Sequence, residues 1–237
     1  MMACRWCAAC GARGCGLAEP YRAAIYYAPE PDDPLWHQGS AWLGRDAATG
    51  AALPQPALPD LPANTQAPRL YGFHATLKAP IALRHGLQAF LEDAKTLAAS
   101  FPAFALAPLA LTTLNGFLAL CLAAPCPELH RLETALVRGL DRHRLPEDAA
   151  AQAKRAQGRT PRQRAHIARY GYPLVIEDFR FHMTLTAALS PNPYAAPAEA
   201  HFGPVLSLPR RVESLCLFTQ NQPGAPFALR GRLRLGG

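Results

Sequence analysis

The sequence predicts an α+β fold with two similar, duplicated lobes, whose antiparallel sheets flank a central cleft. Three observations lead to this prediction. The segment Phe-His-x-Thr-Leu occurs twice, at residues 73–77 and 181–185. Each copy alternates apolar and polar residues, as a half-buried strand does. Each copy is also followed by two further strand-like segments, with helical periodicities interposed, which indicates a repeated unit.

The repeat gives each of its two strands an apolar face and a polar face, because successive side chains of a strand point to opposite sides. The apolar faces, which belong in a core, carry Phe73, Ala75 and Leu77 in the first copy and Phe181, Met183 and Leu185 in the second. The polar faces carry His74, Thr76 and Lys78 in the first copy and Arg180, His182, Thr184 and Thr186 in the second. A strand of this kind is typical of the floor of a polar cleft. Two of them predict one cleft built twice.

The first elements along the chain are a strand, a loop and the first histidine strand. Residues 22–28 are apolar and aromatic and predict a strand, which three prolines between residues 29 and 34 stop. Residues 46–68 carry five prolines and few long apolar side chains, so we expect a long loop. The first histidine strand should cover about 71–79. A helix should follow at 87–99, where apolar residues recur with helical spacing.

A hairpin and a helix come next. Residues 104–114 and 117–123 flank Asn115-Gly116, a strong signal for a two-residue β-turn. Apolar residues then recur at 129, 132, 136 and 140, which predicts a second amphipathic helix.

The last third of the chain predicts two helices and three strands. Residues 146–170 should form two helices split at Pro161, since proline interrupts a helix. The second histidine strand should cover about 178–187. A proline-rich connection follows, and then two strands are expected at 212–219 and 227–235.

The charge of the chain is uneven. The formal net charge is +7, and residues 141–169 hold eight Lys or Arg against three Asp or Glu. This asymmetry favours an anionic ligand, although a solvated helix face with a basic tail predicts the same counts. No apolar run approaches the ~20 residues of a membrane span. We therefore expect a soluble, cytoplasmic protein without a membrane partner.

Residues 1–20 differ in composition from the rest. The sequence has seven cysteines, and an odd number fits reduced thiols better than a disulfide framework. Cys4, Cys7, Cys10 and Cys15 could hold zinc or an iron–sulfur cluster, but the spacing is tight for one tetrahedral ion. We expect a disordered or mis-started extension here, with 21–237 forming the bilobal domain.

The paired motifs predict acid–base chemistry on a phosphate. Histidine titrates nearest neutrality, so His74 and His182 can act as base and acid together. Thr76 and Thr184 can donate to phosphoryl oxygens. Substrate contacts are predicted for the cations Lys78 and Arg180, with Arg22 or Arg45 as possible additions, and for Tyr71 at the mouth of the first motif. The sequence shows no metal-site or cofactor motif, no G-x-S-x-G and no P-loop.

At these residues the sequence resembles the two-histidine (2H) phosphoesterase superfamily, and within it a bacterial branch linked to phosphonate metabolism. The resemblance is carried by residues 21–28, 42–46, 71–80, 171–173 and 179–186. It implies two similar lobes around a cleft and metal-independent opening of cyclic phosphates, or phosphodiester transfer. It also implies acid and base roles for the two motif histidines and phosphate contacts for the two threonines.

We therefore expect a cyclic phosphodiesterase that acts on a small ribose-type cyclic phosphate. A second phosphate on the substrate would account for two or more cations at the cleft. One alternative is an enzyme of RNA ends, a 2′,5′-ligase or 2′,3′-cyclic phosphodiesterase, with the Arg-rich segment 154–169 as its RNA surface. Another is a non-catalytic nucleotide-binding module. The sequence leaves open which histidine is the base and what the oligomeric state is.

Overall fold

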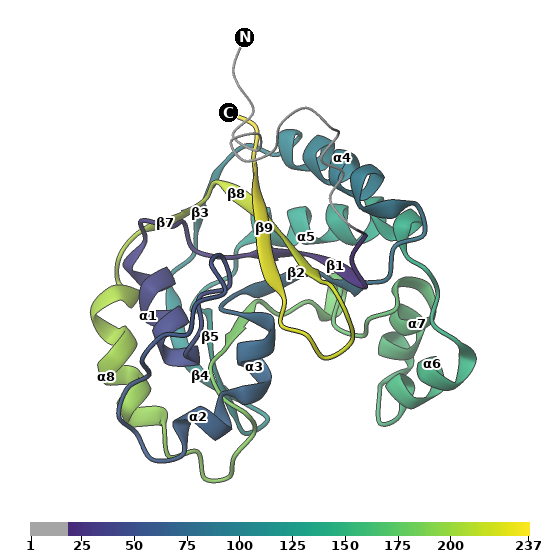
Figure 1. The fold of residues 1–237 in the computed structure, drawn as a ribbon. Helices are drawn as coiled ribbons and strands as arrows, with labels where there is room; N and C mark the ends of the chain where they lie inside the picture. Colours follow the sequence, from purple (N-terminus) through teal and green to yellow (C-terminus); the bar gives the residue numbers. More distant parts are fainter. Residues whose placement is uncertain (1–18) are drawn as a thin grey trace.

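The computed structural model describes residues 19–237, so the predicted cysteine-rich extension lies almost wholly outside the described residues, and its four cysteines entirely so. The described chain is a mixed α/β structure built on a seven-stranded antiparallel sheet in the order β4-β5-β6-β2-β1-β8-β9 (Figure 1). The strands of this sheet are β1 (Arg22–Tyr27), β2 (Ala75–Ile81), β4 (Leu109–Leu114), β5 (Phe117–Leu122), β6 (His182–Thr184), β8 (Ser214–Gln220) and β9 (Ala228–Arg234). The strands β3 (Phe104–Leu106) and β7 (Arg210–Val212) pair separately.

The two histidine strands meet at the centre of this sheet. β2 and β6 pair antiparallel through Ala75 and Met183, the middle residues of the two apolar motif faces. One lobe of the sheet is β2-β1-β8-β9 and the other is β4-β5-β6. The antiparallel α+β class is confirmed, and the two expected sheets are joined edge to edge at the motif.

Each lobe takes strands from both halves of the chain. The hairpin β4–β5 follows the first histidine strand in sequence but pairs with the second, β6. The strand β8 follows the second histidine strand but pairs with β1, next to the first. The repeat is therefore interlaced, and neither lobe is one contiguous stretch of sequence.

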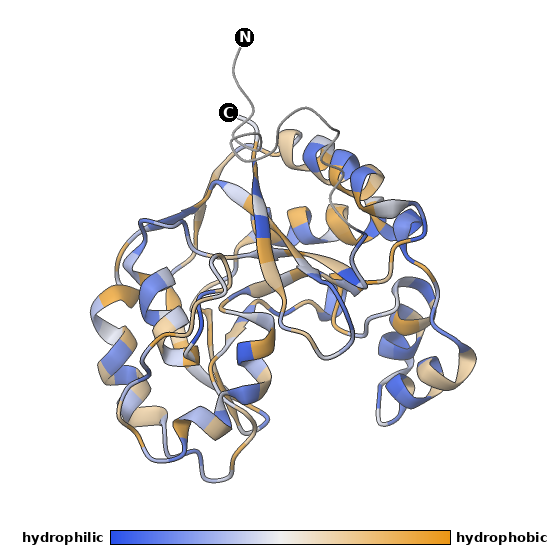
Figure 2. Cartoon of the chain, viewed as in Figure 1, coloured by the Kyte–Doolittle hydropathy of each residue, from blue (hydrophilic) through white to orange (hydrophobic). Residues whose placement is uncertain are grey.

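The central strands are buried on both faces. Every residue of β8 is buried, and β1 is buried from Ala23 to Tyr27. The helices α4 (Gly86–Ala99) and α5 (Pro127–Gly139) pack on each other and on the β2-β1-β8-β9 lobe. The helices α1 (Pro34–Leu43) and α8 (Ala195–Leu206) pack together beside β4 (Figure 1). Figure 2 shows apolar residues concentrated on the strands and inner helix faces.

Two predicted irregular segments contain helices instead. The loop expected at 46–68 gives way to α2 (Leu61–Asn64) and α3 (Gln66–Tyr71), so the first histidine strand starts later than predicted. The proline-rich connection contains α8, where alanines outweigh the prolines. Pro62, Pro68 and Pro197 lie in the first turn of their helices, where a proline removes no intrahelical hydrogen bond, whereas Pro204 lies inside α8.

The two helices expected around Pro161 are confirmed as α6 (Ala149–Ala156) and α7 (Pro161–Tyr170). Thr160 and Gln163 form a capping box at the start of α7. The pair projects from the body of the molecule (Figure 1), and α6 buries no side chain. No helix within residues 19–237 has the length and apolarity to cross a membrane.

Candidate active site

The two motif histidines are held in the same way. His74 immediately precedes β2 and His182 begins β6. The Nδ1 of His74 lies 2.9 Å from the carbonyl oxygen of Gly72, and that of His182 lies 2.8 Å from the carbonyl oxygen of Arg180. A carbonyl only accepts, so each Nδ1 carries the proton. Each Nε2 is therefore the ring atom left for chemistry.

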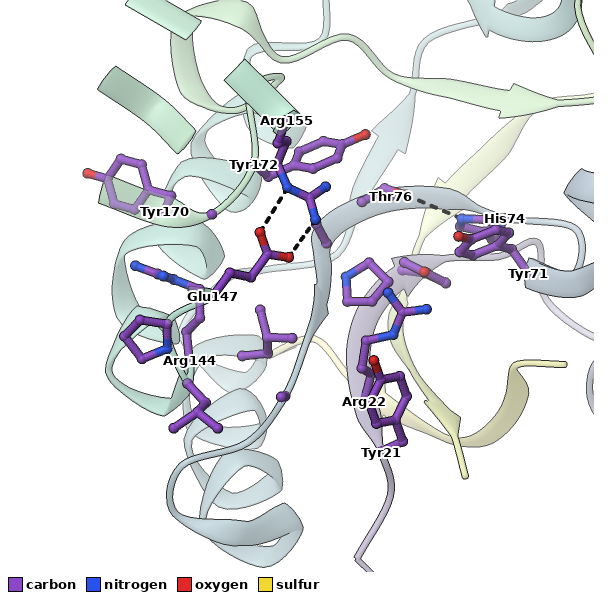
Figure 3. A pocket seen from close by; sticks show the side chains of 18 of the residues that line it. Tyr21, Arg22, Tyr71, His74, Thr76, Arg144, Glu147, Arg155, Tyr170 and Tyr172 are labelled. Atoms are coloured by element: carbon purple, nitrogen blue, oxygen red, sulfur yellow. Dashed lines mark hydrogen bonds and ion pairs between the residues drawn. The ribbon is translucent and has the colours of Figure 1, made fainter. Parts of the chain in front are cut away.

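Both rings border one cavity of about 530 Å³. Thr76 and Thr184 line the same cavity, as Tyr71 does at its edge (Figure 3). The hydroxyl of Thr76 lies 3.3 Å from Nε2 of His74. The structure thus brings together the four residues predicted to act on a phosphate, and it places Tyr71 beside them.

The ring of His74 lies in a largely apolar environment, although the residue is only partly buried. Its ring stacks on that of Tyr26, with centroids 3.8 Å apart and planes inclined by 26°. Burial lowers the pKa of His74 to about 4, and the nearby charge of His182 acts in the same direction, while the Gly72 carbonyl opposes them. His74 is therefore neutral near pH 7 and can accept a proton at Nε2.

Lys78 requires a correction, because it does not line this cavity. Its side chain is buried, and Nζ donates to the carbonyl of Val137 at 3.0 Å and lies 3.5 Å from Asp141. Burial lowers the pKa of Lys78 to about 8. Simple alternation fails here because the pairing of β1 with β2 shifts register on either side of Ile25, and the carbonyl end of α5 attracts the cation. Lys78 is thus bound within the fold by Val137 and Asp141 and does not line the cavity.

Arg180 positions His182 through its backbone carbonyl, whereas its side chain does not line the main cavity. Its carbonyl orients His182, but its exposed side chain borders a small space of about 10 Å³ that Glu133 and His182 also line. Arg45, the possible addition, donates to the carbonyls of Arg69 and Phe227 and is also outside the cavity. Arg22, the other addition, does line the cavity.

The cavity is also lined by polar residues most of which the sequence did not single out. They come from the segment before α6, from α6 itself, and from the end of α7 and the turn after it (Figure 3): Arg144, Glu147, Asp148, Arg155, Tyr170 and Tyr172. Of these, Tyr172 lies in the stretch 171–173 that carries the family resemblance. The basic excess of 141–169 indicated an anion site here in general terms. It could not indicate which cations face inward.

Glu133 of α5 holds the backbone of Ile176, which precedes the second histidine strand, and we call this interaction the Glu133 clamp. Ile176 has φ = 54°, a left-handed conformation that is rare for a β-branched residue. Its N–H donates to both carboxylate oxygens of Glu133, at 3.3 and 3.2 Å, and its carbonyl lies 2.9 Å from Nε2 of His130. Burial raises the pKa of Glu133 to about 7. The clamp therefore holds a strained backbone six residues before His182.

A second cavity of about 280 Å³ adjoins His74. It shares His74, Tyr71 and Thr184 with the main cavity, and its further lining is mostly apolar, including Pro68 and Phe117. Within residues 19–237 no group of three or more His, Cys, Asp or Glu is placed to hold a metal ion.

Comparisons with solved structures show only distant likeness. Escherichia coli LigT in complex with 3′-AMP is 17% identical, with a TM-score of 0.45 over 92% of this chain and 100% of that one. A structure described as a phosphoesterase is 16% identical, with a TM-score of 0.45 over the same shares. Scores at this level assign neither a fold nor a function.

Sequence comparisons are closer. Two curated relatives carry the name ribose 1,5-bisphosphate phosphokinase PhnN. The one from Janthinobacterium sp. (strain Marseille) is 36% identical over 91% of this chain and 51% of its own length. The one from Laribacter hongkongensis (strain HLHK9) is 40% identical over 88% and 50%. The chain thus spans about half the length of these relatives.

A family model, described as "Protein of unknown function (DUF1045)", matches residues 76–228, from the first motif threonine to the start of β9. The match covers more than half of the chain, and it is consistent with the resemblance to two-histidine phosphoesterases inferred from the motifs. The chain belongs to the DUF1045 family.

Proposed function

We propose that the chain is a phosphoesterase that opens a small ribose-type cyclic phosphate by paired histidine catalysis. The observation that carries this proposal is the matched pair His74 and His182. Both rings carry the proton on Nδ1 and border one cavity, each with a threonine two residues further on. Base and acid on opposite sides of a phosphodiester can supply both proton transfers of its hydrolysis.

The environments of the two rings suggest their roles. His74 is neutral near pH 7, so its Nε2 takes the proton of the attacking water while the new O–P bond forms. His182, when protonated, gives its Nε2 proton to the ester oxygen as the old P–O bond breaks. Thr76 and Thr184 donate to the two remaining phosphoryl oxygens, where charge grows in the transition state. One water is consumed, and a phosphate monoester is left.

The relatives support a ribose phosphate as substrate. Their name describes a phosphokinase of ribose 1,5-bisphosphate, and this chain corresponds to about half of their length. The chain lacks a P-loop signature. We therefore assign the kinase activity to the part of those proteins outside the shared half. A ribose phosphate would then be common to the two activities.

A second candidate is a 2′,3′-cyclic nucleotide or RNA end, because the smaller cavity offers Tyr71 and Phe117 for stacking on a base. The predicted RNA surface has less free charge than the sequence indicates. Within it Arg155, Arg162 and Arg169 pair with the carboxylates of Glu147, Asp178 and Asp141. We therefore rank the small sugar phosphate first.

A substrate screen tests the proposal. The purified full chain is incubated with EDTA and a ribose cyclic phosphate, a 2′,3′-cyclic mononucleotide, or an oligoribonucleotide with a cyclic end. Phosphorus NMR then follows the opening of the ring. We expect turnover of the sugar phosphate with the highest kcat/KM. Binding without turnover would favour the non-catalytic module, and preference for the oligonucleotide would favour the RNA enzyme.

A further inference from the structure

The main cavity is lined by more than the histidines and threonines. Arg22 from β1 lines it, and so do Glu147 from the segment before α6 and Arg155 from α6 (Figure 3). The acid–base chemistry uses none of these three residues. Two arginines therefore border a cavity of about 530 Å³ without a part in the proton transfers.

Arg22 is a cation whose charge no carboxylate balances. Its Nε and Nη2 donate to the side-chain oxygen of Gln220, at 2.9 and 2.7 Å, and that amide is neutral. Within residues 19–237 no carboxylate lies within ion-pair distance of it. The guanidinium is half-buried between the rings of Tyr21 and Phe227, 5.3 and 5.5 Å from their centroids. A half-buried, fixed and unbalanced arginine attracts an anion.

Arg155 already binds an anionic group, the carboxylate of Glu147, and a ligand can displace that carboxylate. Its Nε and Nη2 bond the two oxygens of Glu147 at 3.1 and 2.5 Å, the forked geometry in which arginine also takes a phosphate. Both side chains are more than a third exposed, at 37% and 39%, so the pair is held weakly. Arg144 differs, because it is tied to Asp141 at 2.9 Å and to the carbonyl of Arg169 at 2.7 Å.

We propose that Arg22 and Arg155 form a subsite for a second phosphate, a sugar phosphate monoester dianion, with Glu147 as an internal competitor that the phosphate displaces. This rests on the proposed function, since it places the second phosphate of a ribose-type substrate away from the reacting one. Glu147 holds Arg155 in its forked geometry before the ligand arrives. A singly charged cyclic nucleotide has no second phosphate for these two arginines to bind.

Binding of ribose 5-phosphate, which has no bond to be hydrolysed by this chemistry, tests the subsite without relying on turnover. Calorimetry at low ionic strength compares the wild type with Arg155→Gln, Arg22→Gln and Glu147→Gln. We expect each arginine variant to raise Kd about tenfold, the value of a lost charge-assisted contact. We expect Glu147→Gln to lower Kd by about threefold, because the competing carboxylate is gone.

A matched control is available on the neighbouring helix. Arg162 of α7 bonds both oxygens of Asp178, at 2.8 and 2.7 Å, and neither residue lines the cavity. Arg162→Gln and Asp178→Asn should leave Kd unchanged. No binding by the wild type, or a Glu147→Gln variant that binds no more tightly, would overturn the subsite.

Turnover separates the subsite from the esterase. If the wild type opens cyclic phosphates but Arg155→Gln raises KM equally for singly and doubly phosphorylated substrates, the subsite alone is wrong. If ribose 5-phosphate binds with the expected pattern but no cyclic phosphate is opened, the esterase is wrong.

Discussion

The two histidine strands share a sequence but not an environment. β2 runs for seven residues in the middle of the sheet, whereas β6 has three. Opposite Thr76 on the neighbouring strand stands Tyr26, and opposite Thr184 stands Ala119. An aromatic ring therefore covers His74, while the corresponding place beside His182 holds a methyl group. The repeat gives both rings the same Nδ1 contact with a backbone carbonyl, and the neighbouring strand β1 buries His74, which lowers the pKa of that ring.

The difference teaches how a duplicated site can divide its labour. Two identical imidazoles at neutral pH would hold the same protonation state, and base and acid roles would compete. Burial beneath Tyr26 keeps His74 neutral. The motif itself is the same in the two strands, so the covering ring of Tyr26 is what sets His74 apart.

Replacing either histidine should have the largest effect on activity, and it tests whether both strands take part in catalysis. His74→Ala and His182→Ala should each lower kcat/KM by ~10²–10⁴-fold, since each removes one half of an acid–base pair. The pH profile of the wild type should be a bell and should survive EDTA, whereas each variant should lose one limb. Steady-state kinetics from pH 4 to 9 measure this. Full activity in either variant would contradict the mechanism.

Uncovering His74 should make the two strands more alike. In Tyr26→Leu the ring loses its aromatic cover, so the pKa of His74 should rise from about 4 toward the ordinary 6.5. The acid limb of kcat/KM should then move to higher pH, because the base is protonated sooner. NMR titration of His74 checks the shift directly. The control is Phe117→Leu, which changes a ring 6.0 Å from His182 and should leave His74 as it is.

The Glu133 clamp provides a test on the β6 side, because it holds the backbone that leads to His182. The pKa of Glu133 is about 7 in the fold against an ordinary 4.5, so the folded state binds this proton more tightly. Stability from this group is full below about pH 4.5 and falls as pH rises through about 7. Glu133→Gln cannot ionise, so it should gain roughly 1–3 kcal/mol on the wild type across that window.

Urea unfolding at pH 4.5 and pH 8 measures this difference. Glu133→Leu, which removes the acceptor for the Ile176 N–H, should be less stable than Glu133→Gln at both pH values. A gap between wild type and Glu133→Gln that does not change with pH would contradict the assigned shift.

The smallest effect is expected from the Tyr26 hydroxyl. It is buried and has no hydrogen-bond partner within the described chain. Tyr26→Phe keeps the ring over His74 and removes the unpaired group, so the free energy of unfolding should rise by about 1 kcal/mol. The pKa of His74 should not change. Lower stability of Tyr26→Phe in urea would mean that the hydroxyl is in fact paired in solution.

Local sequence patterns predicted where helices and strands form better than they predicted which segments contact one another. The helices at 86–99 and 127–139 and the hairpin at Asn115-Gly116 follow from periodicity and turn chemistry. Alternation placed both motif histidines and threonines at one cavity. It misplaced Lys78, because an irregular pairing with β1 and the end of α5 redirect that side chain.

The sequence named Arg22 as a possible substrate contact but did not name Arg155. The two arginines are 133 residues apart, and no local pattern links them. They line one cavity because β1 and α6 both border it. Likewise α8 was hidden by its prolines, although its alanines favour a helix.

The interlaced sheet also sets the order in which the molecule can be assembled on the ribosome. β1, which carries Tyr26, pairs with β8, and Arg22 at its start stands opposite Gln220. A nascent chain therefore keeps one edge of β1 unsatisfied until β8 has emerged, and an open apolar edge invites association with other chains. Closing a loop of this length late also slows folding. The sheet around Tyr26 and His74 is thus completed only after β8 has been synthesised.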